Sequence, residues 1–482
     1  MGMGACVYTA LCGARNCDRG SHSALSARGR SGEAKWPEFR FGAEGTIDVR
    51  VSKPSRRPHP ERDAMNRRDV LVSGAALLGG SVLLKSARAL GAEPPVPVPP
   101  SPTPQRTAAG YMPVEMPNGT TLPFRMEGGV KIFHLVAEPV KREFAPGMIV
   151  DAWGYNGQTP GPTIEAVEGD RVRIYVTNKL PERTSVHWHG VLLPNGMDGV
   201  AGLNQPHIEP GETYVYEFTL RQHGTLMYHP HSDEMAQMAL GMMGFFIIHP
   251  RARETPRVDR DFAIMLHEWF IAPGTSRPNA AVMTDFNIFT FNSRVWPGTA
   301  PLVVKKGERV RVRFGNLSMD SHPIHLHGYA FEQTATDGGK TPVSARLPET
   351  TVNVPVGTTR DVEWVADVPG DWAFHCHKSH HTMNAMGHDV PNLIGVKQGN
   401  TEEQIRKTLP GYMAMGSAGM GGMMEMARPK NTLPMMTGDG PFGPVEMGGM
   451  FTILKVREGL KTYADPGWYK HPAGTVAYVT KL

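Results

Sequence analysis

Cys376 lies between two histidines in the run His375-Cys376-His377. Thiolates and imidazoles both bind transition metals, and the thiolate is the softer ligand. On a β-strand, neighbouring side chains point to opposite faces, so the cysteine would face one pocket and the two histidines another. The spacing therefore predicts two metal sites lying back to back and joined by a covalent path of one residue.

Three further histidine-rich motifs precede this run, and they are His187-Trp188-His189, His229-Pro230-His231 and His322-Pro323-Ile324-His325-Leu326-His327. Each His-x-His pair aims two imidazoles to the same side of a strand. Neutral imidazole binds copper well and leaves positions open for dioxygen, so eight such groups suit a cluster of three coppers. The eight are His187, His189, His229, His231, His325, His327, His375 and His377. Zinc would need neither this many ligands nor a His-Cys-His bridge.

A cysteine with two further histidines and a weak methionine forms a blue-copper electron-transfer site. The remaining histidine-rich segments supply these ligands on both sides of the cysteine. We assign the site to His322, Cys376, His381 and Met386, with His380 as the alternative to His381 and Met383 as the alternative to Met386. The choice of the later residue in each pair rests on the spacing from Cys376.

The chain repeats itself once, and the repeat places these motifs on equivalent elements. Residues 156–157, 169–174 and 187–190 of the first copy match residues 292–293, 307–312 and 325–328 of the second. Short runs of alternating apolar and polar residues, broken by turn residues, are typical of Greek-key β-sandwiches. We expect one sandwich over 120–250 and another over 258–397. Only 91 positions separate His231 from His322, too few for a third.

The N-terminal region is predicted to contain an export signal followed by a linker. Residues 65–89 hold an arginine pair, an apolar stretch and a small-x-small cleavage site, which together predict a twin-arginine signal peptide and a periplasmic or extracellular protein. Residues 90–119 are expected to be a proline-rich linker, and residues 1–64 a disordered leader produced by the gene model. No segment is long enough to span a membrane.

Charge and cysteine usage exclude some classes of protein. Residues 1–89 hold 15 Lys and Arg against 8 Asp and Glu, so the net charge of +4 leaves the rest of the chain slightly acidic. We therefore expect no nucleic-acid partner. Three of the four cysteines lie in residues 1–64. The exported chain would keep only Cys376, which cannot form an internal disulfide.

Residues 398–482 are expected to form a Met/Gly-rich tail that ends in a strand near 451–456. Ten methionines lie in it: Met413, Met415, Met420, Met423, Met424, Met426, Met435, Met436, Met447 and Met450. Thioethers favour Cu(I), so the tail is predicted either to handle Cu(I) or to fill irregular gaps in packing. For Met235, Met238 and Met242, which follow the second motif at helical spacing, packing is the favoured interpretation.

The four motifs resemble those of the multicopper oxidases, over about residues 125–395. The resemblance implies two cupredoxin-like sandwiches, as in the two-domain, laccase-like branch, with a type 1 copper in the second domain. It implies four coppers per chain. It assigns His187 and His325 to type 2 copper, His189, His229 and His377 to one type 3 copper, His231, His327 and His375 to the other, and His322, Cys376, His381 and Met386 to type 1.

The implied activity is one-electron oxidation of a reducing substrate, phenolic, aromatic or Cu(I), coupled to four-electron reduction of O₂ to water. Cys376 would pass the electrons to the cluster through His375 or His377. Asp198, nine residues after His189, matches a family acid beside the type 2 copper and is expected to donate protons or orient water. A simple turn aspartate before Gly199 is the alternative.

The resemblance also implies a homotrimer with the cluster at subunit interfaces. Two other functions compete with the oxidase. Copper nitrite reductases also have two sandwiches, but they keep type 1 copper in the first domain and lack the coupled pair. A non-enzymatic copper carrier would explain the methionines but not the ordered cluster ligands.

Overall fold

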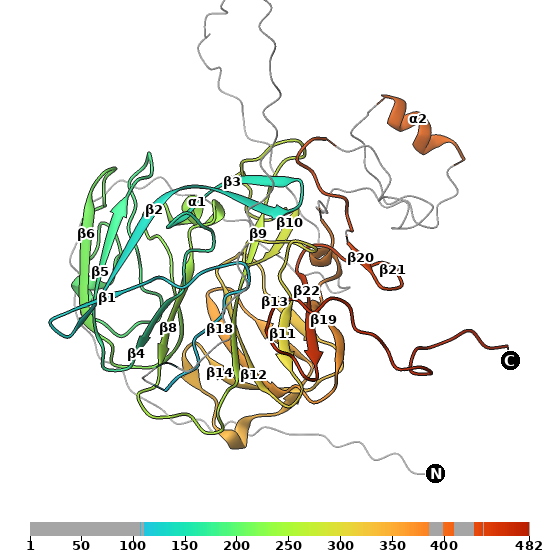
Figure 1. Cartoon of the computed structure of the whole chain (residues 1–482). Coiled ribbons are helices and arrows are strands. Elements are labelled where there is room, and N and C mark those ends of the chain that lie inside the picture. The colour runs from blue at the N-terminus through green and yellow to red at the C-terminus, as the bar shows by residue number, and fades with distance from the viewer. Residues whose placement is uncertain (1–106, 108–109, 385–398, 409–428, 437, 482) are drawn as a thin grey trace, which may run out of the picture. The chain divides into compact units, whose positions relative to one another are not determined.

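The computed structural model describes residues 107, 110–384, 399–408, 429–436 and 438–481. They are mostly β-strands, arranged as two sandwiches, so the predicted all-β, cupredoxin-like fold class is confirmed (Figure 1). The predicted leader, signal peptide, most of the linker, Met386 and the tail methionines from Met413 to Met426 lie outside the described residues. No helix of the described part is long and apolar enough to cross a bilayer.

The first sandwich packs a five-stranded sheet against a three-stranded one. The larger sheet has the order β1-β2-β5-β6, with β3 paired to β2; its strands are β1 (Arg125–Glu127), β2 (Val130–Ala145), β3 (Met148–Tyr155), β5 (Arg171–Asn178) and β6 (Thr213–Thr219). The smaller sheet has the order β4-β8-β7; its strands are β4 (Ile164–Val167), β8 (Gly244–His249) and β7 (Gly224–Tyr228). Short helices η1 (Asn195–Met197) and α1 (Glu234–Ala239) lie in its loops.

The second sandwich packs a seven-stranded sheet against a five-stranded one. The first of these, here the inner sheet, has the order β10-β9-β12-β18-β14-β15, with β16 paired to β14; its strands are β10 (Ile288–Phe291), β9 (Arg260–Trp269), β12 (Arg309–Asn316), β18 (Thr358–Val365), β14 (Phe331–Thr336), β15 (Gly339–Lys340) and β16 (Pro348–Glu349). The other, the outer sheet, has the order β11-β22-β19-β13-β17; its strands are β11 (Leu302–Lys305), β22 (Phe451–Arg457), β19 (Gly370–Cys376), β13 (His322–Leu326) and β17 (Thr351–Val354). The remaining elements are η2 (Val343–Ala345), η3 (Ser379–Thr382), α2 (Thr401–Thr408), β20 (Asp439–Gly440) and β21 (Gly443–Pro444).

Alternation of side chains builds both cores. Val172, Ile174 and Val176 of β5 are fully buried in the core of the first sandwich, together with Trp188, the middle residue of the first histidine motif. On β12, Val310, Val312 and Phe314 occupy the equivalent positions in the second core. The period-2 pattern that the sequence shows is therefore the pattern of burial.

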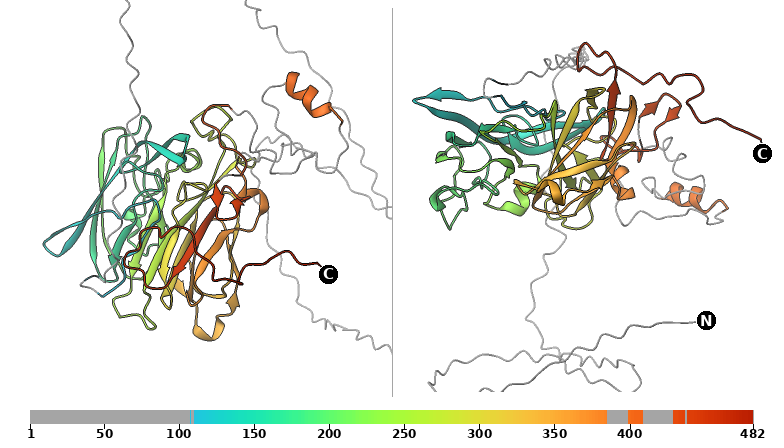
Figure 2. Two further views of the ribbon diagram at one scale, coloured as in Figure 1. Left: turned by 45° about the vertical axis from the view of Figure 1, so that its right-hand side comes forward. Right: turned by 90° about the horizontal axis from the view of Figure 1, so that it is seen from below.

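The C-terminal strand β22 belongs to the second sandwich. It lies between β11, to which it is parallel, and β19, to which it is antiparallel (Figure 2, red). The strand was predicted, but the predicted domain boundary at residue 397 is wrong, because the outer sheet needs β22 to join β11 to β19. Met435, Met436 and Met450 are buried, so this part of the tail fills space in the fold.

Residues 110–119 are not only linker. Glu115 forms a bridge with Phe262 of β9, and its carboxylate contacts buried Arg260 at 2.5 Å. The predicted linker over 90–119 therefore ends before this segment, which packs against both sandwiches with Val114 and Met116 buried.

The first sandwich packs on the inner sheet of the second. Arg313 of β12 is almost fully buried and reaches Asp261 at 2.7 Å, Asp361 at 3.3 Å and the Thr225 hydroxyl of β7 at 2.7 Å. Burial raises the pKa of Asp361 despite the nearby guanidinium. A buried charge is tolerated when paired and hydrogen-bonded, so this network fixes β7 against β12 and β18.

Candidate metal centres

The thiol of Cys376 meets two imidazoles inside the second sandwich. Cys376 ends β19 and is fully buried, as are His322 on β13 and His381 in η3. The Cys376 sulfur lies 3.9 Å from Nδ1 of His322 and 3.5 Å from Nδ1 of His381, and these two nitrogens are 3.1 Å apart. One sulfur and two nitrogens thus converge on a point small enough for one ion.

Contacts around each ring hold its Nδ1 toward the thiol. Nε2 of His322 lies 2.9 Å from the Ser318 hydroxyl and 3.5 Å from the Glu268 carboxylate. The ring of His381 stacks on Phe289, with centroids 3.9 Å apart. His380 meets Phe289 edge-on and is not part of the converging group. The structure therefore brings His381, rather than His380, to the thiol.

The segment that precedes β22 closes this pocket. The Cys376 amide donates to the Met450 carbonyl at 3.1 Å, and the Met450 amide donates to the His381 carbonyl at 2.9 Å. The Asn384 amide donates to the Met435 carbonyl at 2.7 Å. Sequence reasoning missed this enclosure, since the only local signal was the strand near 451–456. Met386 lies outside the described residues, so the choice between Met386 and Met383 stays a prediction.

Four histidines gather at one edge of the first sandwich. His187 and His229 form an isolated antiparallel bridge, and the ring of His187 lies within 5.9 Å of those of His189, His229 and His231. Nδ1 of His189 lies 3.3 Å from Nε2 of His229. We call His187, His189, His229 and His231 the first quartet.

The repeat reproduces this arrangement in the second sandwich. His325 of β13 pairs with His375 of β19 in register, while Ile324 pairs with Cys376. The rings of His325, His327, His375 and His377 lie 4.8–5.7 Å from their neighbours, and the two Nε2 atoms of His327 and His375 are 3.0 Å apart. We call these four residues the second quartet.

Backbone carbonyls fix which nitrogen of four quartet rings is available to a metal. In each case Nδ1 faces a carbonyl oxygen: His187 with Asp198 (2.8 Å), His229 with Pro230 (2.9 Å), His325 with Thr350 (2.7 Å) and His375 with Cys376 (2.9 Å). A ring that donates from Nδ1 keeps its lone pair on Nε2 and is held in one orientation. The support of His229 by the carbonyl of the next residue recurs at His375 in the second copy, whereas the carbonyls behind His187 and His325 lie 11 and 25 residues along the chain.

Burial keeps these ligands neutral. It lowers the pKa of His229 and of His322 to about 3 and that of His375 to about 4. Because the unfolded chain binds more protons than the folded one between those values and about 6.5, acid in this range favours unfolding of the metal-free sites. Burial also raises the pKa of the Cys376 thiol to about 12, so a metal must displace its proton.

The two quartets lie on different faces in one chain. Alternation along β13 turns His322 toward the sandwich core with Cys376, and His325 and His327 toward the outside of the outer sheet. The first sandwich, however, packs on the inner sheet, through Arg313 and Thr225. Among the described residues, ring contacts between quartet histidines accordingly stay within each quartet. His327 and His377 are exposed.

Asp198 supports His187 mainly through its backbone. Its carbonyl accepts from Nδ1 of His187, and its carboxylate lies 3.5 Å from the same nitrogen. The next residue, Gly199, has φ +88°, and a Cβ there would lie 1.8 Å from the Val186 carbonyl oxygen. Only glycine lets the turn approach the histidine strand this closely.

Sequence reasoning missed Glu234. This residue begins α1, and its carboxylate oxygens lie 3.6 Å from Nδ1 of His229 and 3.4 Å from Nε2 of His231. The available signal was its position three residues after His231, which a helical turn brings back beside the motif. It places a second acid at the first quartet, besides Asp198.

Comparison with known proteins agrees with this geometry. Two multicopper oxidase family models match residues 137–253 and 273–395, one for each sandwich and its histidine motifs. The chain belongs to the multicopper oxidases. Copper resistance protein A of Escherichia coli is 46% identical over 114 residues, which are 24% of this chain and 18% of that protein. The chain thus spans about a fifth of the length of the curated relatives it matches first.

Two further similarities are of interest. A probable nitrite reductase-hydroxylamine oxidoreductase fusion protein of Kuenenia stuttgartiensis is 28% identical over 276 residues, covering 54% of this chain and 31% of that protein. The crystal structure of a blue copper oxidase from Nitrosomonas europaea superposes with a TM-score of 0.51 at 26% identity, covering 67% of this chain and 85% of that one.

The donor sets of this multicopper oxidase fit copper. A thiol and two imidazoles with Nδ1 atoms aimed at the sulfur suit a blue-copper site, and paired imidazole nitrogens 3.0–3.3 Å apart suit a shared ion in each quartet. Copper supplies one-electron redox chemistry at these sites when it is bound.

Gly199→Ala should weaken metal binding at His187. The added Cβ must push the turn away from Val186, and the Asp198 carbonyl moves with it. Loss of such an outer partner lowers metal affinity by about 10–100-fold. Metal analysis after dialysis against a chelator would show less copper per chain. Gly196→Ala is the matched control, because a Cβ there meets nothing within 4 Å; equal copper retention by both variants would contradict the role of the turn.

Proposed function

We propose that this protein is an oxidase that takes single electrons from a reducing substrate at the Cys376 site and uses four of them to reduce O₂ to two waters. The observation that carries the proposal is the register of β13 with β19. It holds Cys376 against His322 on one face and His375 beside His325 on the other. The proposed site of electron entry and the proposed site of oxygen reduction thereby lie next to each other on opposite faces of the same two strands.

Cys376→Ser tests this function directly. Without the thiolate the type 1 site should lose its ion, while the quartets keep theirs. The expected result is one copper fewer per chain, loss of the absorption of the blue site, and O₂ uptake reduced to background with a methoxyphenol or with Cu(I). A Cys376→Ser protein that consumes O₂ at the normal rate would end the proposal.

The nitrite reductase alternative fits the residues less well, although one relative carries that name. It does not use the coupled His375-Cys376-His377 run, and it leaves the His229-Pro230-His231 motif of the first sandwich without a purpose. A copper carrier would likewise not need carbonyl supports behind four separate rings. The oxidase accounts for both features.

Asp198 is proposed to deliver protons or orient water beside His187. Asp198→Asn keeps the backbone carbonyl that holds His187, so it isolates the carboxylate. Loss of a positioned acid costs about 10²–10⁴-fold in rate. We expect slow O₂ reduction with a changed pH profile, while anaerobic reduction of the blue site by substrate stays at its normal rate. Stopped-flow absorbance measures both steps; an unchanged pH profile would leave Asp198 as a turn residue.

We also propose that the oxygen-reducing cluster forms between chains. A three-copper cluster needs ligands from both quartets, and the first sandwich packs on the inner sheet while the second quartet lies outside the outer sheet. The exposed His327 and His377 would then meet the first quartet of another copy. Head-to-tail contacts of this kind close into rings, and a homotrimer is the proposed assembly.

Mixing two inactive variants tests this assembly. His189→Ala disables the first quartet and His327→Ala the second, so each protein alone should be inactive. In mixed trimers one interface in three pairs two intact quartets, so refolding or exchanging a 1:1 mixture should recover about a quarter of normal O₂ uptake. A cluster within one chain would give no recovery. Light scattering on the mixture confirms the oligomeric state.

The reducing substrate is proposed to be a phenol, an aromatic amine or Cu(I). Similarity to a copper resistance protein supports Cu(I), but it covers only 114 residues. Export by the twin-arginine route to the periplasm is proposed from residues 65–89 alone.

A further inference from the structure

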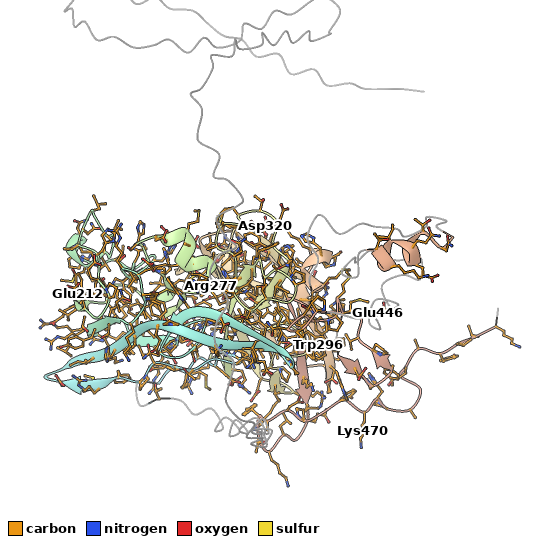
Figure 3. All side chains as sticks on the ribbon, turned by 90° about the horizontal axis from the view of Figure 1, so that it is seen from above. Glu212, Arg277, Trp296, Asp320, Glu446 and Lys470 are labelled. Atoms are coloured by element: carbon orange, nitrogen blue, oxygen red, sulfur yellow. The ribbon has the colours of Figure 1, made fainter. Side chains whose placement is uncertain are left out.

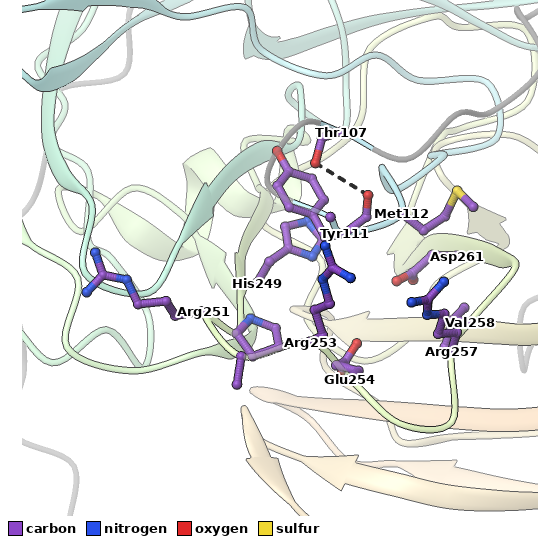
Figure 4. A pocket seen from close by; sticks show the side chains of 13 residues that line it. Thr107, Tyr111, Met112, His249, Arg251, Arg253, Glu254, Arg257, Val258 and Asp261 are labelled. Atoms are coloured by element: carbon purple, nitrogen blue, oxygen red, sulfur yellow. Dashed lines mark hydrogen bonds between the residues drawn. The ribbon is translucent and has the colours of Figure 1, made fainter.

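A cavity of about 250 Å³ lies beside the connector that joins the two sandwiches (Figure 4). The connector runs from Pro250, after β8, to Asp259, before β9. Three of its arginines, Arg251, Arg253 and Arg257, line the cavity. The volume is slightly below the roughly 300–1,000 Å³ of pockets for drug-sized ligands, and it is far above the ~15 Å³ that one water needs. The cavity therefore has room for a small molecule or a polyatomic ion.

One wall of the cavity is a stacked pair of rings. Tyr111 lies against His249, with centroids 3.8 Å apart and ring planes at 11° to each other. Nε2 of buried His249 lies 2.8 Å from the Glu165 carboxylate of β4, which also accepts from the Val114 amide at 3.1 Å. The first sandwich thus fixes this wall from behind, so the cavity is shaped by the fold itself.

The three arginines of the connector have no partner of their own. All three are exposed, and among the residues that the structure describes none of their side chains forms an ion pair or a hydrogen bond. Arg277, which is labelled in Figure 3, differs from them because it lies over the ring of Trp153 at 5.8 Å. The guanidinium groups of the connector are therefore available to a ligand.

Two carboxylates also line the cavity, but basic side chains outside it already neutralise both. Glu254 meets Arg311 at 3.0 Å and Lys340 at 3.2 Å. Asp261 meets Arg313 at 2.7 Å. None of these three basic residues lines the cavity. The lining as a whole thus keeps an excess of positive charge, and an anion suits it better than a cation or a neutral molecule.

The arginines come from both ends of the connector. A Cβ at Gly169, in the turn between β4 and β5, would lie 3.4 Å from the guanidinium carbon of Arg251, so this arginine lies against the first sandwich. Arg257 stands three residues before β9 of the second sandwich. In Figure 4 Arg253 is seen between them. An anion held by these side chains would connect the two sandwiches.

We propose that this cavity binds a small polyvalent oxyanion, of the phosphate or dicarboxylate class, and that the bound anion strengthens the junction of the two sandwiches. The planar fork of arginine pairs with two oxygens of such an anion at once. A ligand that binds only the folded chain raises its stability. The inference does not depend on the oxidase function, because the cavity contains none of the proposed copper ligands.

Calorimetric titration of the copper-loaded enzyme with inorganic phosphate tests the site. In about 150 mM NaCl, which screens diffuse surface attraction, we expect saturable binding of one phosphate per chain. The double variant Arg253→Met/Arg257→Met keeps long side chains but removes two guanidinium groups. Its Kd should rise at least about tenfold, since one hydrogen bond to a charged group contributes about that factor.

Arg183→Met is the matched control for this titration. Arg183 is also exposed and has no ion-pair partner in the described part of the chain, but it does not line the cavity. Its substitution should leave the Kd for phosphate unchanged. Thermal unfolding gives a second readout: phosphate should raise the Tm of the wild type and of the Arg183→Met protein, but not that of the double variant.

Succinate, titrated in the same way, distinguishes the two classes of ligand. Tighter binding of succinate assigns the site to a dicarboxylate, and tighter binding of phosphate assigns it to a phosphoryl ligand. The proposal is wrong if neither anion binds saturably to the wild type. It is equally wrong if the double variant and the Arg183→Met protein bind both anions with the same affinity, because the arginines of the connector would then play no part.

Discussion

The whole site depends on the alternation of side chains at the end of β19. One extended stretch of three residues sends a thiol into the sandwich and imidazoles out of it, and β13 does the same beside it in antiparallel register. A slip of one residue between these strands would exchange the two faces and separate Cys376 from His322. The register is protected by burial, because Ile324, Leu326 and Phe374 occupy the core on the same face as the thiol.

Burial then sets the chemistry of the ligands on that face. Water is excluded by Phe289 and by the segment that leads into β22, so His322 stays neutral and the thiol keeps its proton until a metal replaces it. Cys376, His322 and His381 would therefore hold a copper ion in a site already shaped for it, and the thiol would release its proton on binding. Four rings of the quartets are held differently, by carbonyls behind Nδ1 rather than by enclosure, which leaves their Nε2 atoms available to a metal.

Much of the fold and of the candidate metal sites could be predicted from the sequence, because the patterns that specify them are local. The repeat and the alternation of residues 172–176 predict strands and faces correctly, and the spacing alone favours His381. The His-x-His pairs gather into quartets as expected, although only His325 and His375 of these eight histidines lie within a strand. What the sequence did not show is long-range. The insertion of β22 between β11 and β19, the docking of residues 114–116 on β9, and the contact of Glu268 with His322 depend on which surfaces meet, and no local pattern records that. The methionines illustrate the difference, because the same residue type fills the core at Met436 and lines an open cavity at Met319.

The metal sites on the two faces differ in how many of their proposed ligands one chain supplies. Three of the four ligands proposed for the type 1 site, His322, Cys376 and His381, meet within the described part of one chain, whereas each quartet supplies only half of the ligands of the proposed three-copper cluster. If the cluster forms between chains, an unassembled chain could accept an electron but would have no complete site at which to reduce O₂. Oxygen reduction by four electrons would then be confined to the closed assembly, where a full cluster is present. The exposed His327 and His377 fit this order of events, since imidazoles that are to meet a partner must remain uncovered until it arrives.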